Sequence, residues 1–321
     1  MTVTTIDAAY LGYEGFAATY LLQQGDRAAF IETANAPAVP RMLDVLKETG
    51  VSPDQVDYII ITHVHLDHAG GAASLMQACP NATLLAHPSA AKHAIDPSKL
   101  VRSAKGVYGE ERFAEMYGTI DPIPEARVRI MGDDETLDWN GRELRFLHTR
   151  GHANHHFCIH DPTSGGVFTG DSFGLVYPAL QTNGLFAIPS TSPTDFDAAA
   201  AKVSLDRIVG TGASTAYLTH FGGVTDLEGV AGQLHTQLDR YGAIVDEAFA
   251  SDRDDEGVAA FCSEQVSALF DDLLRAHDLD DPTTRKILAT DIDLNGQGVA
   301  FAVKKKRFKA QQNNQGASLI R

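Results

Sequence analysis

The most informative part of this chain is the heptapeptide Thr62-His63-Val64-His65-Leu66-Asp67-His68. It continues a short, largely β-branched run (57–61), which is typical of a buried strand. In an α/β fold the backbone leaves the sheet where a strand ends, and side chains converge there on the rim. Imidazole nitrogens and carboxylate oxygens bind zinc, and also iron or manganese in similar sites. We therefore predict that this loop binds metal.

The spacing within the loop indicates two ions. Residues two apart in an extended backbone share a face, so His63 and His65 can reach one ion. Asp67 and His68 lie past the bend and can reach another. Because one loop cannot saturate two ions, further ligands are expected at the ends of other strands. Three residues follow later apolar runs in this way: His152, Asp171 and His220.

The series His-Val-His-Leu-Asp-His, Gly-His, Gly-Asp and a late His resembles the motifs of the metallo-β-lactamase superfamily over about residues 6–225. The resemblance implies an α/β fold, a four-layer αββα sandwich. By position it implies that one ion is bound by His63, His65 and His152, and the other by Asp67, His68 and His220, with Asp171 bridging. The spacing is most similar to glyoxalase II-like and lactonase-like hydrolases, and to a subgroup of them with unassigned substrates.

Three departures narrow the resemblance. No cysteine stands at a ligand position, as one does in some β-lactamases, because Asp171 is there instead. His65 replaces the glutamate of the diiron flavoprotein relatives, which disfavours that oxygen-reducing branch. After Asp171 the chain lacks the tyrosine three residues on that marks acyl-homoserine lactonases, which disfavours that activity in particular.

The activity implied is hydrolysis of an ester, thioester or lactone bond in a small molecule. Two divalent ions about 3.5–4 Å apart would share a water and generate hydroxide from it at neutral pH. Zinc is the first expectation, with iron or manganese as alternatives. Asp67 and Asp171 are the expected catalytic residues, since they both bind metal and orient the nucleophile. Three further residues are candidates for supporting the ligands or contacting substrate: His155, His156 and Tyr177.

Two other interpretations remain open. A mononuclear iron dioxygenase acting on a thiol or persulfide would also use two histidines and a carboxylate. A sensor that binds metal and a ligand without turnover would keep the same residues. Counting the bound metals and testing for oxygen dependence would separate the first of these from a two-metal hydrolase.

Composition restricts the partners. The chain has 321 residues, of which 44% are hydrophobic, so a packed core is expected. The formal net charge of −16 repels phosphate backbones, so nucleic acid is not an expected partner. The basic run 304–309 is interpreted as a solvated helix end.

We find neither a signal peptide nor about 18 consecutive apolar residues, and the three cysteines are odd in number. These features favour a cytoplasmic protein without disulfides, acting on a small molecule away from membranes; a homodimer is left open.

The pattern of apolar residues and turn residues outlines the rest of the chain. We predict a β-hairpin over 16–31, a helix over 38–50, and then a helix and a strand over 71–78 and 83–86. The proline-containing segment 88–126 is predicted to be an insertion with helices near 89–94 and 109–117. Later strands are expected at 128–130, 143–148, 156–159, 166–169 and 216–219, with a helix over 195–209. Residues 1–225 would form the catalytic core and residues 226–321 a helical C-terminal appendage, with helices at 226–249, 258–277 and 285–309; Gly296 and Gly298 weaken the last.

Overall fold

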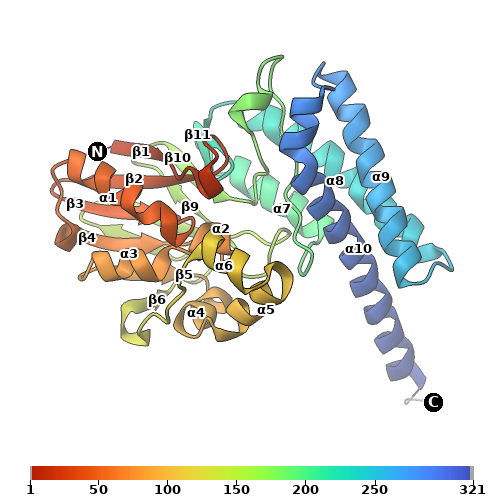
Figure 1. Cartoon of the computed structure of the whole chain (residues 1–321), viewed down its shortest axis with the longest axis horizontal. Coiled ribbons are helices and arrows are strands. Elements are labelled where there is room, and N and C mark those ends of the chain that lie inside the picture. The colour runs from red at the N-terminus through yellow and green to blue at the C-terminus, as the bar shows by residue number, and fades with distance from the viewer. Residues whose placement is uncertain (1, 319–321) are drawn as a thin grey trace.

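The structure is a computed structural model, and it describes residues 2–318. Within these residues two six-stranded sheets lie face to face with helices on their outer sides (Figure 1). The first sheet has the order β1(Thr2–Asp7), β2(Ala18–Gln24), β3(Arg27–Ile31), β4(Val56–Ile60), β5(Thr83–Ala86), β6(Val128–Ile130). The second has the order β12(Gly222–Val224), β11(Thr215–Leu218), β10(Gly166–Gly170), β9(Phe157–Asp161), β8(Arg142–His148), β7(Thr136–Trp139). The expected αββα sandwich is confirmed.

Side-chain alternation along the strands builds the layers. In β4, Ile60 points into the interior between the sheets, whereas Ile59 points outward to a helix layer. That outer layer contains α1(Val39–Glu48), α3(Ala72–Ala78) and α4(Pro88–Ile95). In the second sheet, Phe157 and Phe168 point inward while Cys158 points outward, toward α7(Ala198–Val209). Each sheet therefore buries side chains on both of its faces.

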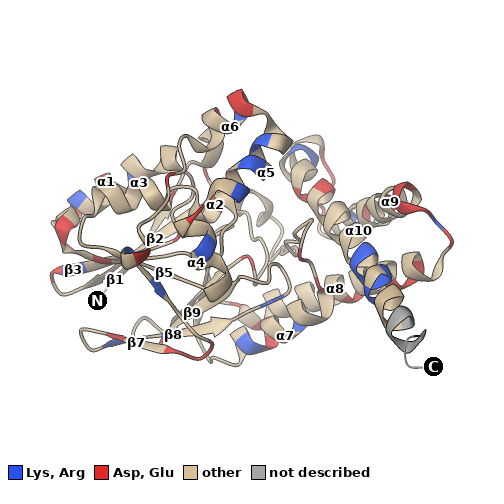
Figure 2. Ribbon diagram, turned by 90° about the horizontal axis from the view of Figure 1, so that it is seen from below, with Lys and Arg blue, Asp and Glu red and all other residues tan. Residues whose placement is uncertain are grey.

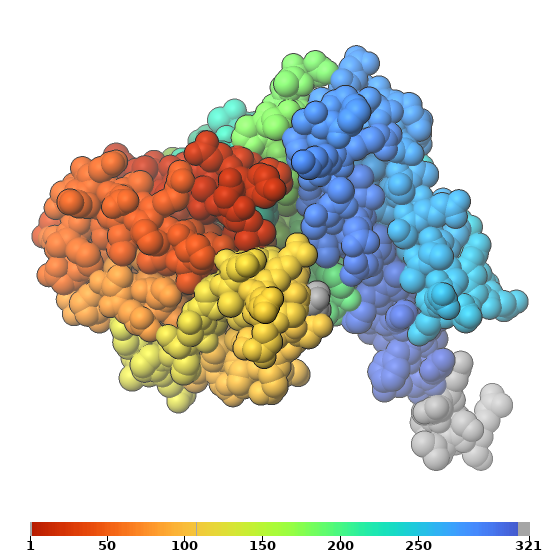
Figure 3. Space-filling model, in the orientation of Figure 1, coloured from red at the N-terminus to blue at the C-terminus, as the bar shows by residue number. Residues whose placement is uncertain are grey.

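The C-terminal helices continue the outer layer of the second sheet. α8(Leu227–Ala250) packs on α7, and α9(Asp255–Ala276) and α10(Pro282–Ser318) pack on α8 and on each other. In the space-filling view these helices form a lobe at one side of the sandwich, with part of the 88–126 insertion in front (Figure 3). No helix within residues 2–318 is long and apolar enough to cross a membrane.

Most predicted elements are confirmed, but some observed elements, including α2(Leu66–Ala69), were not predicted. The hairpin, the helices near 38–50 and 71–78, and the later strands all lie where expected. The sequence patterns missed β1, β7 and β12, and the insertion contains a third helix, α5(Ser98–Tyr108), between α4 and α6(Glu110–Tyr117). The domain boundary at residue 225 stays a prediction, and residues 319–321 of the appendage lie outside the described part.

The doubtful helix over 285–309 is confirmed and is longer than expected. Both glycines that weakened it lie where α10 is closely packed. A Cβ on Gly298 would lie 2.2 Å from the Thr191 hydroxyl, and one on Gly296 would lie 3.1 Å from the Cα of Ser263. The glycines therefore permit close approach and do not end the helix.

The basic residues at 304–309 in α10 form ion pairs and hydrogen bonds with neighbouring parts of the chain. Figure 2 shows these basic residues toward the C-terminal end of α10. Lys304 and Lys306 pair with Asp255 and Asp246 at 3.5 and 2.6 Å, and Arg307 donates to backbone carbonyls near residue 250. The run is therefore not the solvated helix end that was expected: it lies within α10, and its side chains pair with neighbouring helices and turns.

Candidate metal centre

Strand ends bring the seven predicted ligands together at one edge of the sandwich. The loop after β4 leads into α2(Leu66–Ala69) and carries four of them. The others follow β8, β10 and β11, which belong to the second sheet. The site therefore lies where the two sheets meet. The geometry groups these residues in three overlapping clusters: His63, His65 and His152; His63, His68 and Asp171; Asp67, His68 and His220.

The first cluster consists of three imidazoles whose nitrogens converge. The Nε2 atoms of His63 and His152 lie 2.9 and 3.0 Å from Nδ1 of His65. His63 is fully buried and His152 nearly so. Such an arrangement of three nitrogens is one face of a tetrahedral zinc site.

Asp171 lies between this first cluster and the cluster of Asp67, His68 and His220, which is called the second cluster from here on. Its Oδ2 is 3.4 Å from Nε2 of His152, while its Oδ1 is 3.2 and 3.6 Å from Nε2 of His68 and His220. Asp67 completes the second cluster, with Oδ2 at 3.5 Å from His68 and 3.4 Å from His220. One oxygen of Asp171 thus faces each cluster, as a bridging carboxylate requires.

The protonation of the ring nitrogens shows that a cation fits the first cluster. Nδ1 of His152 lies 3.1 Å from the Ser190 carbonyl, which only accepts, so Nδ1 must carry the proton and Nε2 a lone pair. Nδ1 of His63 lies 3.0 Å from the Thr62 hydroxyl, which itself donates to Glu32. Two lone pairs therefore face Nδ1 of His65, which can supply only one hydrogen. A metal ion removes this mismatch.

The contacts of the second cluster indicate independently that a metal ion fits there too. Nε2 of His68 and Oδ1 of Asp171 are both buried and lie 3.2 Å apart, yet neither atom makes a hydrogen bond of acceptable geometry within the described residues. Leaving buried polar atoms unpaired costs about 1–3 kcal/mol each, so such atoms call for an explanation. Nδ1 of His220 donates to the Phe16 carbonyl at 2.6 Å, which leaves its Nε2 free for a metal.

Burial and the neighbouring charges set the two clusters apart electrostatically. Burial, reinforced by the neighbouring histidines, holds the pKa of His63 and His65 well below its usual value, so they are neutral. Burial also opposes charge on His68, but the carboxylates of Asp171, Asp67 and Glu32 outweigh it and raise its pKa. For Asp171, burial is outweighed by the adjacent histidines, and its pKa lies well below the usual range.

The three candidates for supporting roles occupy different places. His156 is fully buried; its Nε2 accepts from the Asp171 backbone N–H at 3.2 Å, and its Nδ1 lies 2.9 Å from the Thr149 hydroxyl. His155 is half-buried and stacks on His63 with ring centroids 6.0 Å apart. Tyr177 lies edge-on to His220, at a centroid distance of 6.4 Å. His156 thus hydrogen-bonds to a predicted ligand, while the rings of the other two border the site.

Two further carboxylates near the site escaped the sequence patterns. Glu32 follows β3, is 1% exposed, and contacts His68 and Thr62. It has the same signal as Asp171, an acidic residue directly after an apolar strand, which could have identified it. Asp291 of α10 accepts from the Tyr177 hydroxyl at 3.4 Å, and burial raises its pKa to about 7. Nothing in the helical pattern around Asp291 indicates that it lies beside the site.

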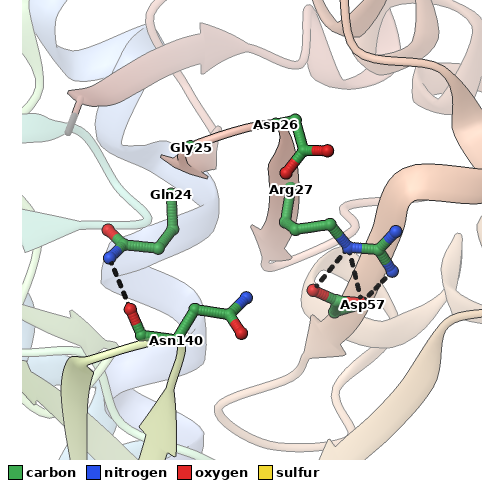
Figure 4. A pocket seen from close by; sticks show the side chains of 6 residues that line it. All are labelled: Gln24, Gly25, Asp26, Arg27, Asp57 and Asn140. Carbon is green, nitrogen blue, oxygen red and sulfur yellow. Dashed lines mark hydrogen bonds and ion pairs between the residues drawn. The ribbon is translucent and has the colours of Figure 1, made fainter.

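A separate hollow lies at the opposite ends of the strands. It has a volume of about 450 Å³ and is lined by the β2–β3 turn, Asp57 and Asn140 (Figure 4). Arg27 is ion-paired with Asp57, and the Gln24 amide donates to the Asn140 carbonyl at 2.9 Å. These polar groups are bound to one another, and none of the three metal-binding clusters lies there.

Comparison with known proteins agrees with this geometry. Residues 12–220 match the family model described as the metallo-β-lactamase superfamily. The metallo-β-lactamase fold-containing protein ST1585 of Sulfurisphaera tokodaii is 31% identical over 163 residues, which is 47% of this chain and 58% of that protein. Its crystal structure superposes over 92% of this chain and 97% of that chain, with a TM-score of 0.64 and 21% identity. This likeness extends the shared fold beyond the sandwich into the C-terminal helices.

Some relatives have names that include an activity. The hydroxyacylglutathione hydrolase of Aeromonas salmonicida is 27% identical over 118 residues, 37% of this chain and 34% of that protein. The atrochrysone carboxyl ACP thioesterase of Passalora fulva is 26% identical over 159 residues, 48% of this chain and 37% of that protein. In these sequence alignments the chain therefore spans less than two thirds of the length of each of the three relatives.

Proposed function

This chain belongs to the metallo-β-lactamase superfamily, and on that premise we propose that it hydrolyses an ester, thioester or lactone bond in a small molecule at a centre of two divalent metal ions. The observation that carries the proposal is the placement of Asp171, with one oxygen toward each cluster of histidines. The relatives named as a hydroxyacylglutathione hydrolase and a thioesterase support acyl-bond hydrolysis as the reaction.

The metal ions would polarise the substrate carbonyl and lower the pKa of a shared water toward neutrality. His63, His65 and His152 would bind one ion, and Asp67, His68 and His220 the other. Zinc suits this set of nitrogen and oxygen ligands, and iron or manganese are the alternatives.

The protein's own groups hold these ligands in place. The Ser190 hydroxyl donates to Oδ2 of Asp171 at 3.0 Å, and the Ser190 carbonyl fixes the tautomer of His152. Asp67 and Asp171 would accept hydrogen bonds from the attacking water and orient it toward the carbonyl carbon. Because these carboxylates have lowered pKa values, they remain charged and can do so at neutral pH.

The substrate would enter beside His155 and Tyr177, which border the site without belonging to a ligand cluster. Tyr177 is supported by Phe16, with ring centroids 5.0 Å apart, and by Asp291 from α10. The C-terminal helices thus contribute a wall to the proposed substrate site.

The test is a panel of ester, thioester and lactone substrates. Protein stripped by a chelator and reloaded separately with zinc, manganese or iron is assayed with and without oxygen. We expect turnover of at least one acyl substrate that requires metal and is equal in the two atmospheres. Turnover of thiols or persulfides that needs oxygen would instead indicate the iron dioxygenase, and ligand binding without any turnover would indicate the sensor.

A further inference from the structure

Glu32 is a buried acid that the proposed chemistry leaves without a role. It directly follows β3, is 1% exposed, and its backbone adopts a left-handed conformation with φ of 64°. This conformation is unfavourable for a residue with a Cβ, and it persists only where surrounding contacts enforce it. A buried carboxylate is also costly unless it is paired. Both costs indicate that this carboxylate is held in place by specific contacts.

One oxygen of Glu32 contacts three residues from two segments of the chain. Its Oε1 accepts from the Thr62 hydroxyl, lies 3.3 Å from Nδ1 of His68, and lies 3.4 Å from the Thr219 hydroxyl. The Thr62 hydroxyl in turn lies 3.0 Å from Nδ1 of His63. Glu32 therefore acts on His68 directly and on His63 through Thr62. These two histidines belong to different ions in the proposed centre.

The residues after Glu32 fix the same loop through its backbone. Thr33 donates twice to the His68 carbonyl, from its N–H at 2.9 Å and from its hydroxyl at 2.8 Å. The Gly71 N–H donates to the Ala34 carbonyl at 3.0 Å, and a Cβ on Gly71 would lie 2.4 Å from the Thr33 carbonyl oxygen. The Glu32 carboxylate and the metal-binding loop are thus held in register with each other.

We propose that Glu32 is a positioning residue that orients one histidine ligand of each metal ion, so that both ions lose affinity when this single carboxylate is removed. The inference rests on the proposed two-ion centre. By accepting from Nδ1 of His68, and from Thr62 beneath His63, the carboxylate keeps the proton on Nδ1 and directs each Nε2 lone pair into the site. Glu32 therefore holds, within the single loop that follows β4, one histidine ligand of each ion.

The experiment titrates Co²⁺ into the metal-free protein, following the visible spectrum and competing with a chelator to obtain both affinities. Glu32→Gln is expected to weaken both sites by about 10–100-fold, the range for losing such a support. Thr62→Val removes the hydroxyl that links Glu32 to His63 but leaves the Glu32–His68 contact. It is expected to weaken one site more than the other, and Thr62→Ser to restore it. Glu135→Gln, at a partly exposed acid paired with Arg129, is the matched control and should change neither affinity.

Thermal unfolding of each metal-free variant checks that it is folded. If Glu32→Gln does not fold, Glu32→Asp is measured instead, because it retracts the carboxylate by one methylene and carries the same expectation. A folded Glu32 variant that keeps both affinities within twofold, or loses only one, overturns this inference alone. A wild-type protein that binds fewer than two ions overturns the two-ion proposal and this inference with it.

Discussion

Replacing Gly298 in α10 by alanine is expected to destabilise the protein, whereas the same change at Gly232 in α8 is expected to stabilise it. In an exposed helix, alanine is favoured over glycine by about 0.5–1 kcal/mol. Gly232 is exposed, and a Cβ there would have nothing within 4 Å, so this gain should be realised. A Cβ on Gly298 would lie 2.2 Å from Oγ1 and 2.6 Å from Cβ of Thr191.

The clash at Gly298 cannot be relieved by rotating a flexible side-chain end. The Cβ of Thr191 is fixed to its backbone, and its hydroxyl donates to the Leu294 carbonyl at 3.0 Å. Overpacking of this kind costs about 1–3 kcal/mol, which sets the expected difference between the two variants. The segment that would be displaced includes Ser190, which contacts Asp171 and His152, so Gly298→Ala should also lower activity.

The assay is urea unfolding of both variants and the wild type at equal metal loading. The midpoint should fall for Gly298→Ala and rise for Gly232→Ala, with unchanged slopes. If both substitutions raised the midpoint equally, α10 would not pack closely on residues 190–192. The C-terminal helix would then not form a wall of the site.

Two further predictions concern the metal ligands. His63→Ala and Asp171→Ala should lower metal content and activity together. His277→Ala, at a residue of the C-terminal lobe that packs on the Phe186 ring, should lower neither. Metal analysis and the acyl-substrate assay check this, and activity retained without metal would contradict it. For His68 and His220, burial is outweighed by Asp171 and other carboxylate contacts, so both pKa values are raised and protons must leave when metal binds. The metal affinity of the site that contains His68 and His220 should therefore fall as the pH is lowered from 8 to 6. The metal affinity of the site that contains His63 should change little, because the pKa of His63 is already lowered. Calorimetry in buffers of different ionisation enthalpy measures the released protons, and equal release at both sites would refute this assignment.

Local sequence patterns predicted the elements whose own residues are mostly apolar and therefore signal burial. β4 and the loop after it were found because an apolar, β-branched run ends in residues with ligand chemistry. β1 was missed because Thr2–Asp7 is largely polar and half-exposed, and it is a strand only through pairing with β2. β7 was likewise hidden, although Trp139 is 2% exposed between the sheets and donates to Asp57 at 2.8 Å.

The residues of the candidate site that follow strands could be predicted from the sequence. Residues that other elements bring to the site through tertiary packing could not. The seven predicted ligands converge, since strand ends of both sheets meet at one edge. Glu32 carries a local signal that was not used, whereas Asp291 has none, because only the packing of α10 on the sandwich places it near Tyr177. Tertiary contacts of this kind cannot be read from periodicity alone.

The most direct test of the central claim is the metal content of the wild-type protein, purified without chelators and measured by elemental mass spectrometry. The account predicts two divalent transition-metal ions per chain, falling to fewer than two when Asp171 is replaced by alanine. Protein that is folded and contains no transition metal, and that takes up none when zinc, iron or manganese is supplied, would contradict it.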